Sequence, residues 1–331
     1  EQPTVPEHRL RRFYALRTLG FTLLEMRQRQ EAIDAFEDAL QTIKKLSSDQ
    51  PREPKFLRLM ANHLSMMAQQ LGGQAEPSLR QDRWSEVIDA YSRLIELEPN
   101  KLAHRLKRGR AYQANGDHDQ AQQDFDEYLR PFDQGVEVSP GQWQTRNRRG
   151  IELLKLERYA EAADDFAKAA ELAPSRRLIY RNWASSLWPQ EQWQQAADVL
   201  GEAVELDLTL AGWRERYELA LCALAAGDIE RYRDVCDLML TISANVNDRL
   251  QMNFAAWTSV LADRGIDEYE VAVDLTTKAV SSQAENEQFL NTLGAALYRA
   301  GRYDEALILL TELTYRQSQP DHIENSSPAY C

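Results

Sequence analysis

Histidines and cysteines are the residues of this chain that could bind a transition metal or serve as nucleophiles. Zinc sites bring such ligands together at short, regular spacings, and a catalytic cysteine needs a nearby base. Here they are scattered, without an HExxH or Cys-x-x-Cys motif, at His8, His63, His104, His118 and His322, and at Cys222, Cys236 and Cys331. We therefore expect solvated surface histidines, core cysteines at the first two cysteine positions, no disulfide framework and no metal site.

Catalytic motifs are also missing. The sequence contains no GxSxG, GxGxxG or P-loop, and none of the glycine-rich, HRD or DFG motifs of a protein kinase. Adjacent carboxylates at Asp164 and Asp165 could act as a general acid and base, but their segment has a helical pattern, and we expect both on its solvated outer face. We predict no catalytic residue and no cofactor in this chain.

Positive charge, in contrast, is concentrated in particular segments. Three segments with net charges of +5, +3 and +3 alternate with three of -4, -3 and -5, the basic ones being residues 101–116, 143–156 and 176–188 and the acidic ones 117–130, 157–172 and 189–207. Lys and Arg bind carboxylates and phosphates, and the guanidinium group does so with two parallel hydrogen bonds. If these basic segments lie side by side, they form a site for an acidic or phosphorylated peptide.

The composition limits the class of protein. The chain has 331 residues, of which 43% are hydrophobic, with a net charge of -13. This length fits two domains or one extended array. The acidic balance disfavours nucleic-acid or membrane-surface binding, and no apolar run reaches the length of a membrane span. There is no signal peptide and no initiator Met, so we expect a cytoplasmic segment of a longer protein.

A repeated pattern shows how the charged segments are positioned. Segments such as "EAIDAFEDAL", "EAADDFAKAA" and "EALILLTEL" align without gaps, and three of the seven intervals between copies are 34 residues. Each copy has a small residue, a large one four positions later, and usually Gly or Ala twelve positions earlier, as in Gly20, Gly109, Gly150 and Gly294. Small residues let two antiparallel helices approach closely, and the large residue fills the remaining space. The spacing therefore predicts an all-α solenoid of about eight helix-turn-helix units.

This pattern resembles the tetratricopeptide repeat (TPR) family, which combines a small residue at position eight, Ala at twenty, an aromatic at twenty-four and Pro near thirty-two. The copies depart from it at Tyr232, which is large where Ala is expected, and at Thr276, which replaces the aromatic. The resemblance implies a superhelix whose first helices line a concave groove. The boundaries it suggests are a linker at 1–12, units one to three at 13–130 with an insertion at 72–82, a linker at 131–142, units four to eight at 143–317, and a truncated tail at 318–331.

A narrower resemblance concerns the C-terminal half. The stretches "ELALCALAAGDIERYRDVCDLML" and "FLNTLGAALYRAGRYDEAL" are similar to the C-terminal TPR region of certain large bacterial serine/threonine-protein kinases and related multidomain signalling proteins. This resemblance implies an alternative function, in which the repeats position substrates for a kinase domain that lies outside this chain.

With the first helices placed in the groove by the family resemblance, the charge pattern predicts a basic groove. We expect a non-catalytic scaffold that binds an extended acidic or phosphorylated peptide of a partner protein through Lys107, Arg110, Arg148 and Arg181, with Trp188 and Tyr217 as apolar surface. Three alternatives remain open: the two charge layers pair within the array, as at Arg108 and Arg149; the basic helices bind RNA; or the chain is an enzyme. Self-association through the last unit is a further expectation.

Overall fold

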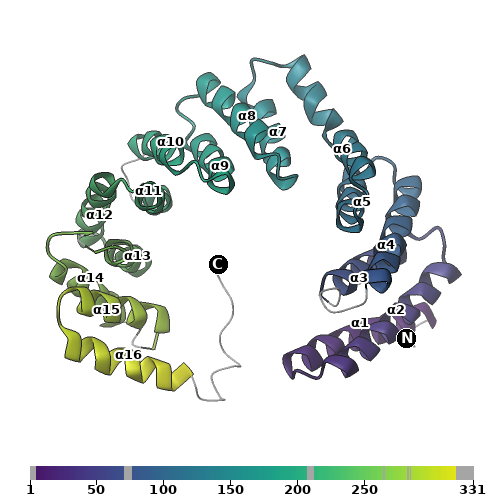
Figure 1. Ribbon diagram of the computed structural model, residues 1–331, viewed down its shortest axis with the longest axis horizontal. Helices are drawn as coiled ribbons and strands as arrows, with labels where there is room; N and C mark the ends of the chain where they lie inside the picture. The colour runs from purple at the N-terminus through teal and green to yellow at the C-terminus, as the bar shows by residue number, and fades with distance from the viewer. Residues whose placement is uncertain are drawn as a thin grey trace. The chain divides into compact units, whose positions relative to one another are not determined.

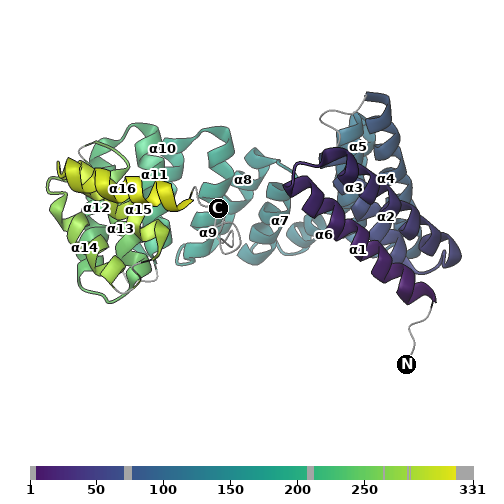
Figure 2. The same ribbon diagram turned by 90° about the horizontal axis from the view of Figure 1, so that it is seen from below.

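The computed structural model describes residues 5–70, 77–206, 212–263, 265–281, 283 and 285–317, which are mostly helical (Figures 1 and 2). In this part of the chain sixteen α-helices follow one another as eight pairs, without a strand. The predicted all-α solenoid of about eight helix pairs is confirmed. The first and second helices of the pairs are α1 (Val5–Glu25) and α2 (Arg29–Asp49), α3 (Pro54–Gln70) and α4 (Pro77–Leu97), α5 (Leu102–Asn115) and α6 (His118–Val138), α7 (Trp143–Lys155) and α8 (Tyr159–Leu172), α9 (Arg177–Leu187) and α10 (Trp193–Glu205), α11 (Trp213–Ala226) and α12 (Ile229–Ala244), α13 (Arg249–Val260) and α14 (Glu270–Ser281), and α15 (Glu287–Arg299) and α16 (Tyr303–Gln317), with a 3-10 turn η1 (Trp188–Gln190) after α9.

Four glycines let the helices of a pair approach closely. A Cβ atom on Gly150 would lie 2.7 Å from the ring of Phe166, sixteen residues further on and fully buried. Real Cβ atoms essentially never approach another heavy atom within 3.0 Å. The same relation, each at 2.5 Å, joins Gly20 to Phe36, Gly109 to Phe125 and Gly294 to Leu310. These four, the helix-pair glycines, occupy the positions that the sequence spacing predicts.

The turn inside several pairs requires a left-handed backbone. Gly116, Gly227 and Gly301 have φ angles of 92°, 76° and 79°, and Arg27 and Glu157 adopt 61° although they carry side chains. Glycine has no steric penalty in this conformation. The turn geometry is therefore kept even where the sequence does not supply glycine.

Tyr232 shows how the array accommodates a large residue at a small position. It is fully buried, and its hydroxyl donates a hydrogen bond to the Thr258 carbonyl at 2.5 Å and accepts one from the Ala262 amide at 3.3 Å. Space for the ring exists because Gly265 has no side chain: a Cβ atom there would lie 3.0 Å from the tyrosine. The phenol thus fills the space beside the long connection from α13 to α14.

The helices extend beyond two predicted boundaries. Helix α1 begins at Val5, so residues 5–12 continue the first helix instead of forming a linker. Helix α6 passes through Pro131 and ends at Val138, inside the linker predicted at 131–142. A proline inside a helix removes one backbone hydrogen bond and crowds the carbonyl four residues earlier, but the buried Val136 still gives the last turns of α6 an apolar contact. Of the predicted insertion, residues 77–82 belong to α4; residues 72–76 and the tail at 318–331 lie outside the described residues.

The chain divides into two compact units, residues 1–134 and residues 135–331. Unit 1 contains α1 to α5 and most of α6, and unit 2 contains α7 to α16. Within unit 2, α9, α11 and α13 lie on the inner side of the curve that its helices follow, and α10, α12 and α14 lie on the outer side (Figure 1). The inner row of unit 2 therefore consists of first helices.

Candidate functional site

Buried carboxylates neutralise two arginines of the first helices. Nε and Nη2 of Arg149 donate to the two oxygens of Asp165 at 2.6 and 2.7 Å, and Arg108 binds Asp124 in the same way, with both distances 2.7 Å. Asp165 is 2% exposed and Asp124 3%. Asp165 therefore faces α7, and the prediction that it lies on the solvated outer face is wrong. For these two arginines, the charge layers do pair within the array.

The predicted contacts of unit 1 lie on α5. Lys107 is exposed, but its ammonium group donates to the side-chain oxygen of Asn62 on α3 at 3.0 Å. Partial burial lowers the pKa of the Lys107 ammonium, and the nearby charges of Arg58 and Arg110 lower it further. Arg110 is exposed on the same helix. Lys107 and Arg110 thus form a basic surface on α5, and the contact of Lys107 with Asn62 attaches it to α3.

Two histidines are structural, contrary to the expectation that all would be solvated. His63 is 1% exposed, and its Nε2 lies 2.9 Å from the Phe36 carbonyl oxygen; its pKa is lowered, first by burial. His104 is 4% exposed and contacts Glu98 at 2.8 Å. His63 thus connects α3 to α2, and His104 connects α5 to the residue that follows α4.

In unit 2, an amide pair places the basic residues of α7 beside those of α9. Asn182 donates to the side-chain oxygen of Asn147 at 3.0 Å. The next residue after Asn147 is Arg148, which is exposed, and the residue before Asn182 is Arg181, which is half-buried. Within the described residues, Arg181 has no salt bridge. The structure thus carries two of the predicted cations on adjacent first helices.

The two predicted aromatics continue this row onto α11 and α13. The indole N–H of Trp188 points to the Cys222 sulfur at 3.1 Å, so η1 is attached to α11. Tyr217 packs edge-on against Phe254 with ring centroids 5.7 Å apart, and Trp213 lies 4.6 Å from the same ring. Trp188 and Tyr217 remain half-buried, so part of each aromatic ring is exposed.

Glu218 is the residue of this surface that the sequence did not reveal. One oxygen of its carboxyl group is inaccessible and has no hydrogen-bond partner. Burial raises the pKa of Glu218 to about 7; Arg181 acts in the opposite direction, Glu215 raises it, and Arg214 lowers it. A signal existed: α11 carries Glu215 and Glu218, whereas the basic segments at 101–116 and 176–188 carry no acid. We call Arg148, Arg181, Trp188, Tyr217 and Glu218 the inner-row site.

The shifted carboxyl group predicts a pH-dependent stability. The pKa of Glu218 is about 7 in the folded protein and 4.5 in a free side chain, so the folded state holds the extra proton. Stability should therefore fall as pH rises from about 4.5 to 7 and level off above that range. Since a pKa unit equals about 1.4 kcal/mol and this side chain is partly exposed, we expect a loss on the order of 1 kcal/mol.

Urea unfolding at several pH values, compared between the wild type and Glu218→Gln, isolates this contribution from all other titrating groups. The variant should lack the decrease. Parallel pH profiles for the two proteins would show that Glu218 ionises normally.

Neither a metal-binding cluster nor a membrane-spanning helix is present among the residues that the structure describes. No group of three or more His, Cys, Asp or Glu side chains in this part of the chain is arranged to hold a metal ion. None of its helices combines the length and the apolar character of a membrane span.

The helix pairs repeat along the chain with glycine contacts inside them, and their exposed features are charged and aromatic surfaces. This arrangement defines a helical-repeat protein. A tetratricopeptide repeat family model matches residues 78–137, 106–177, 181–246 and 260–322, and a second such model matches residues 14–52. The chain belongs to the tetratricopeptide repeat family. Proteins of this family generally mediate protein–protein interactions.

Individual relatives are distant. The small glutamine-rich tetratricopeptide repeat-containing protein 2 of Mycosarcoma maydis is 28% identical over 119 residues, which are 36% of this chain and 32% of that protein. The chain thus spans about a third of this relative. Among solved structures, YrrB, described as a TPR protein with an unusual peptide-binding site, has 14% identity and a TM-score of 0.43 over 58% of this chain and 94% of its own. Yeast Tom70 has 13% identity and a TM-score of 0.37 over 91% of each chain.

Proposed function

We propose that unit 2 is a non-catalytic scaffold that binds an extended, acidic or phosphorylated segment of a partner protein at the inner-row site. The observation that supports this most is the position of Arg148 and Arg181 on adjacent first helices, beside the Asn147–Asn182 contact. Guanidinium groups on neighbouring helices can bind successive carboxylates or phosphates of one peptide.

The other members of the site set the kind of peptide. Trp188 and Tyr217 offer half-buried aromatic faces for an apolar side chain of the ligand. A segment that alternates acidic and apolar residues therefore fits better than a purely acidic one.

Lys107 and Arg110 belong to unit 1, and their participation in the same site stays a prediction. Each unit carries its own basic surface on first helices, α5 in unit 1 and α7 with α9 in unit 2. Variants of Lys107 and Arg110 test that contribution separately.

Charge reversal on a first helix should weaken peptide binding. For a labelled probe peptide of alternating Glu and Leu, Arg148→Glu should reduce the affinity about tenfold, since a favourable contact becomes a repulsive one. Fluorescence anisotropy on the full chain measures this. Raising NaCl from about 0.05 to 0.5 M should weaken wild-type binding in the same direction.

Lys168→Glu is the matched control, because Lys168 is exposed on the second helix α8 and the charge change is identical. Its affinity for the probe should stay within about twofold of the wild type. Equal losses of affinity in both variants would mean that binding depends only on the net charge of the protein. Unchanged binding by Arg148→Glu, or a preference for the probe with Gln in place of Glu, would refute the site.

The alternative function, a substrate-positioning region of a bacterial serine/threonine-protein kinase, stays a prediction from the sequence resemblance. Its test is the coding sequence upstream of this segment, where a glycine-rich loop and an HRD motif would be evident. The inner-row site would then hold the kinase substrate or a regulator, so the binding experiment applies to both functions.

A further inference from the structure

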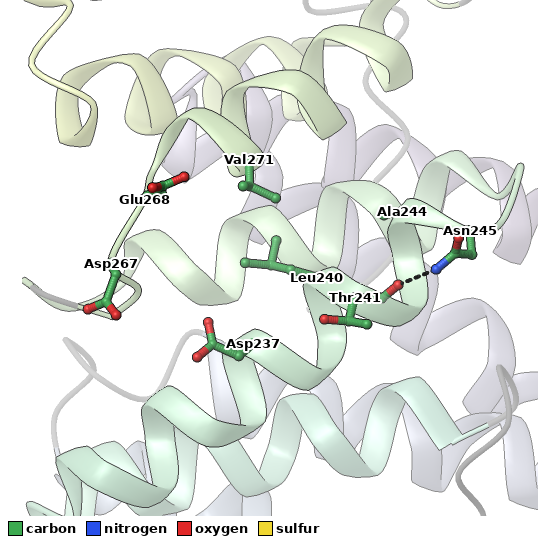
Figure 3. Close-up of a pocket in the computed structure, with 8 residues that line it drawn as sticks. All are labelled: Asp237, Leu240, Thr241, Ala244, Asn245, Asp267, Glu268 and Val271. Atoms are coloured by element: carbon green, nitrogen blue, oxygen red, sulfur yellow. Dashed lines mark hydrogen bonds between the residues drawn. The ribbon is translucent and has the colours of Figure 1, made fainter.

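A groove on the outer side of unit 2 lies between α12 and α14. Its volume is about 530 Å³, within the range of ligand pockets, roughly 300–1,000 Å³. Its centre and one end are apolar and consist of Leu240, Ala244 and Val271. The other end carries two carboxylates, those of Asp237 and Glu268 (Figure 3). The groove therefore combines an aliphatic surface with carboxylates on one side.

Elsewhere in unit 2, ion pairs connect neighbouring second helices. Asp198 on α10 pairs with Arg231 on α12 at 2.6 Å, and Glu270 on α14 pairs with Arg302, the residue before α16, at 3.2 Å. Opposite charges thus face one another across these contacts.

The α12–α14 contact differs, because its acids outnumber its bases. Asp267 pairs with Arg233, but Asp237 and Glu268 form no salt bridge within the described residues. Burial raises the pKa of the Asp237 carboxyl group; the charge of Asp267 raises it further, and Arg233 counteracts this. The groove thus has a surplus of negative charge that the chain itself does not neutralise.

We propose that this α12–α14 groove binds a short segment of a partner protein in which a Lys or Arg lies beside an aliphatic residue. The cation would lie between Asp237 and Glu268, and the aliphatic side chain would contact Leu240 and Val271. Opposite charge gives the contact its orientation, and burial of Val271, which is 40% exposed, adds apolar contact. The ligand is opposite in charge to that of the inner-row site, and the inference does not depend on the function proposed there.

Neutralising the two carboxylates tests the groove. A labelled hexapeptide with adjacent Arg and Leu residues should bind the full chain, and the double variant Asp237→Asn with Glu268→Gln should bind it about tenfold more weakly. Both side chains are exposed, so the variant should fold normally, which its melting temperature verifies. Fluorescence anisotropy gives the affinities.

Two controls make the result specific. Asp274→Asn neutralises an exposed acid of α14 that does not line the groove, and it should retain wild-type affinity. The same peptide with Gln in place of Arg should bind about tenfold more weakly, because it lacks the positive charge that the carboxylates attract. Equal affinity for the Gln and Arg peptides, an unchanged affinity in the double variant, or no binding of the Arg-Leu peptide up to about 1 mM would each overturn the proposal.

Discussion

Replacing Arg149 by Met should lower the free energy of unfolding by about 3 kcal/mol. The substitution leaves Asp165 buried without its bidentate partner, and removing one member of a buried pair typically costs about 3–5 kcal/mol. The lower end applies because Arg146 lies 3.5 Å from the same carboxylate and can compensate in part. Equilibrium urea unfolding of the full chain measures the loss.

The converse substitution, at Asp165, should lower the free energy of unfolding by less than Arg149→Met does. This difference makes the prediction specific. Asp165→Asn leaves a charged Arg149, but that side chain is 25% exposed and can turn toward water. The surface pair of Arg158 and Glu161 provides the control: Arg158→Met should change stability by less than about 1 kcal/mol. Equal effects of Arg149→Met and Arg158→Met would mean that the buried pair contributes no more than a surface contact.

Replacing Gly150 by Leu should destabilise unit 2 by about 2–3 kcal/mol. A Cβ atom alone would come within 2.7 Å of Phe166, and this ring is fully buried, so α7 and α8 must separate. Overpacking of this kind typically costs about 1–3 kcal/mol. Even Ala should destabilise at this position, although Ala in a helix is normally about 1 kcal/mol better than Gly.

Two other glycines calibrate this result by urea or thermal unfolding. Gly294→Leu should cost less, because the facing Leu310 is only half-buried and can move outward. Gly201→Ala on α10 should be neutral or stabilising, since the nearest atom to its added Cβ is an arginine nitrogen 3.7 Å away. If Gly150→Ala stabilised the protein as Gly201→Ala does, the close approach of α7 and α8 would be disproved.

The fold was predictable because its signal is local and repeated. The interval of sixteen residues between Gly150 and Phe166 is fixed by two helical faces and one short turn, and several copies show the same interval. Periodicity of this kind depends little on distant parts of the chain. The helix pairs could therefore be assigned from the sequence.

The site was harder to predict because charge alone does not show which face a residue occupies. Asp164 and Asp165 are neighbours in sequence, but one is exposed and the other is buried against Arg149. Glu218 owes its raised pKa to burial, which Arg181 on α9 counteracts and Glu215 on α11 reinforces, and such an environment is visible only after the helices are packed. Arg148 and Arg181, in contrast, could be proposed from the charge distribution along the sequence, and their role in binding stays a prediction.

The paired Arg149 and Asp165 restrict how this protein can change during evolution. A mutation of Arg149 alone passes through an intermediate with an unmatched buried carboxylate, so selection would favour exchanges in which Asp165 changes first or both codons change in close succession. The preceding helix pair contains the same kind of ion pair, in which Arg108 binds Asp124 sixteen residues further on. Duplicating one helix pair would copy both the arginine and the aspartate of its ion pair. The array can therefore lengthen without leaving a buried charge unpaired.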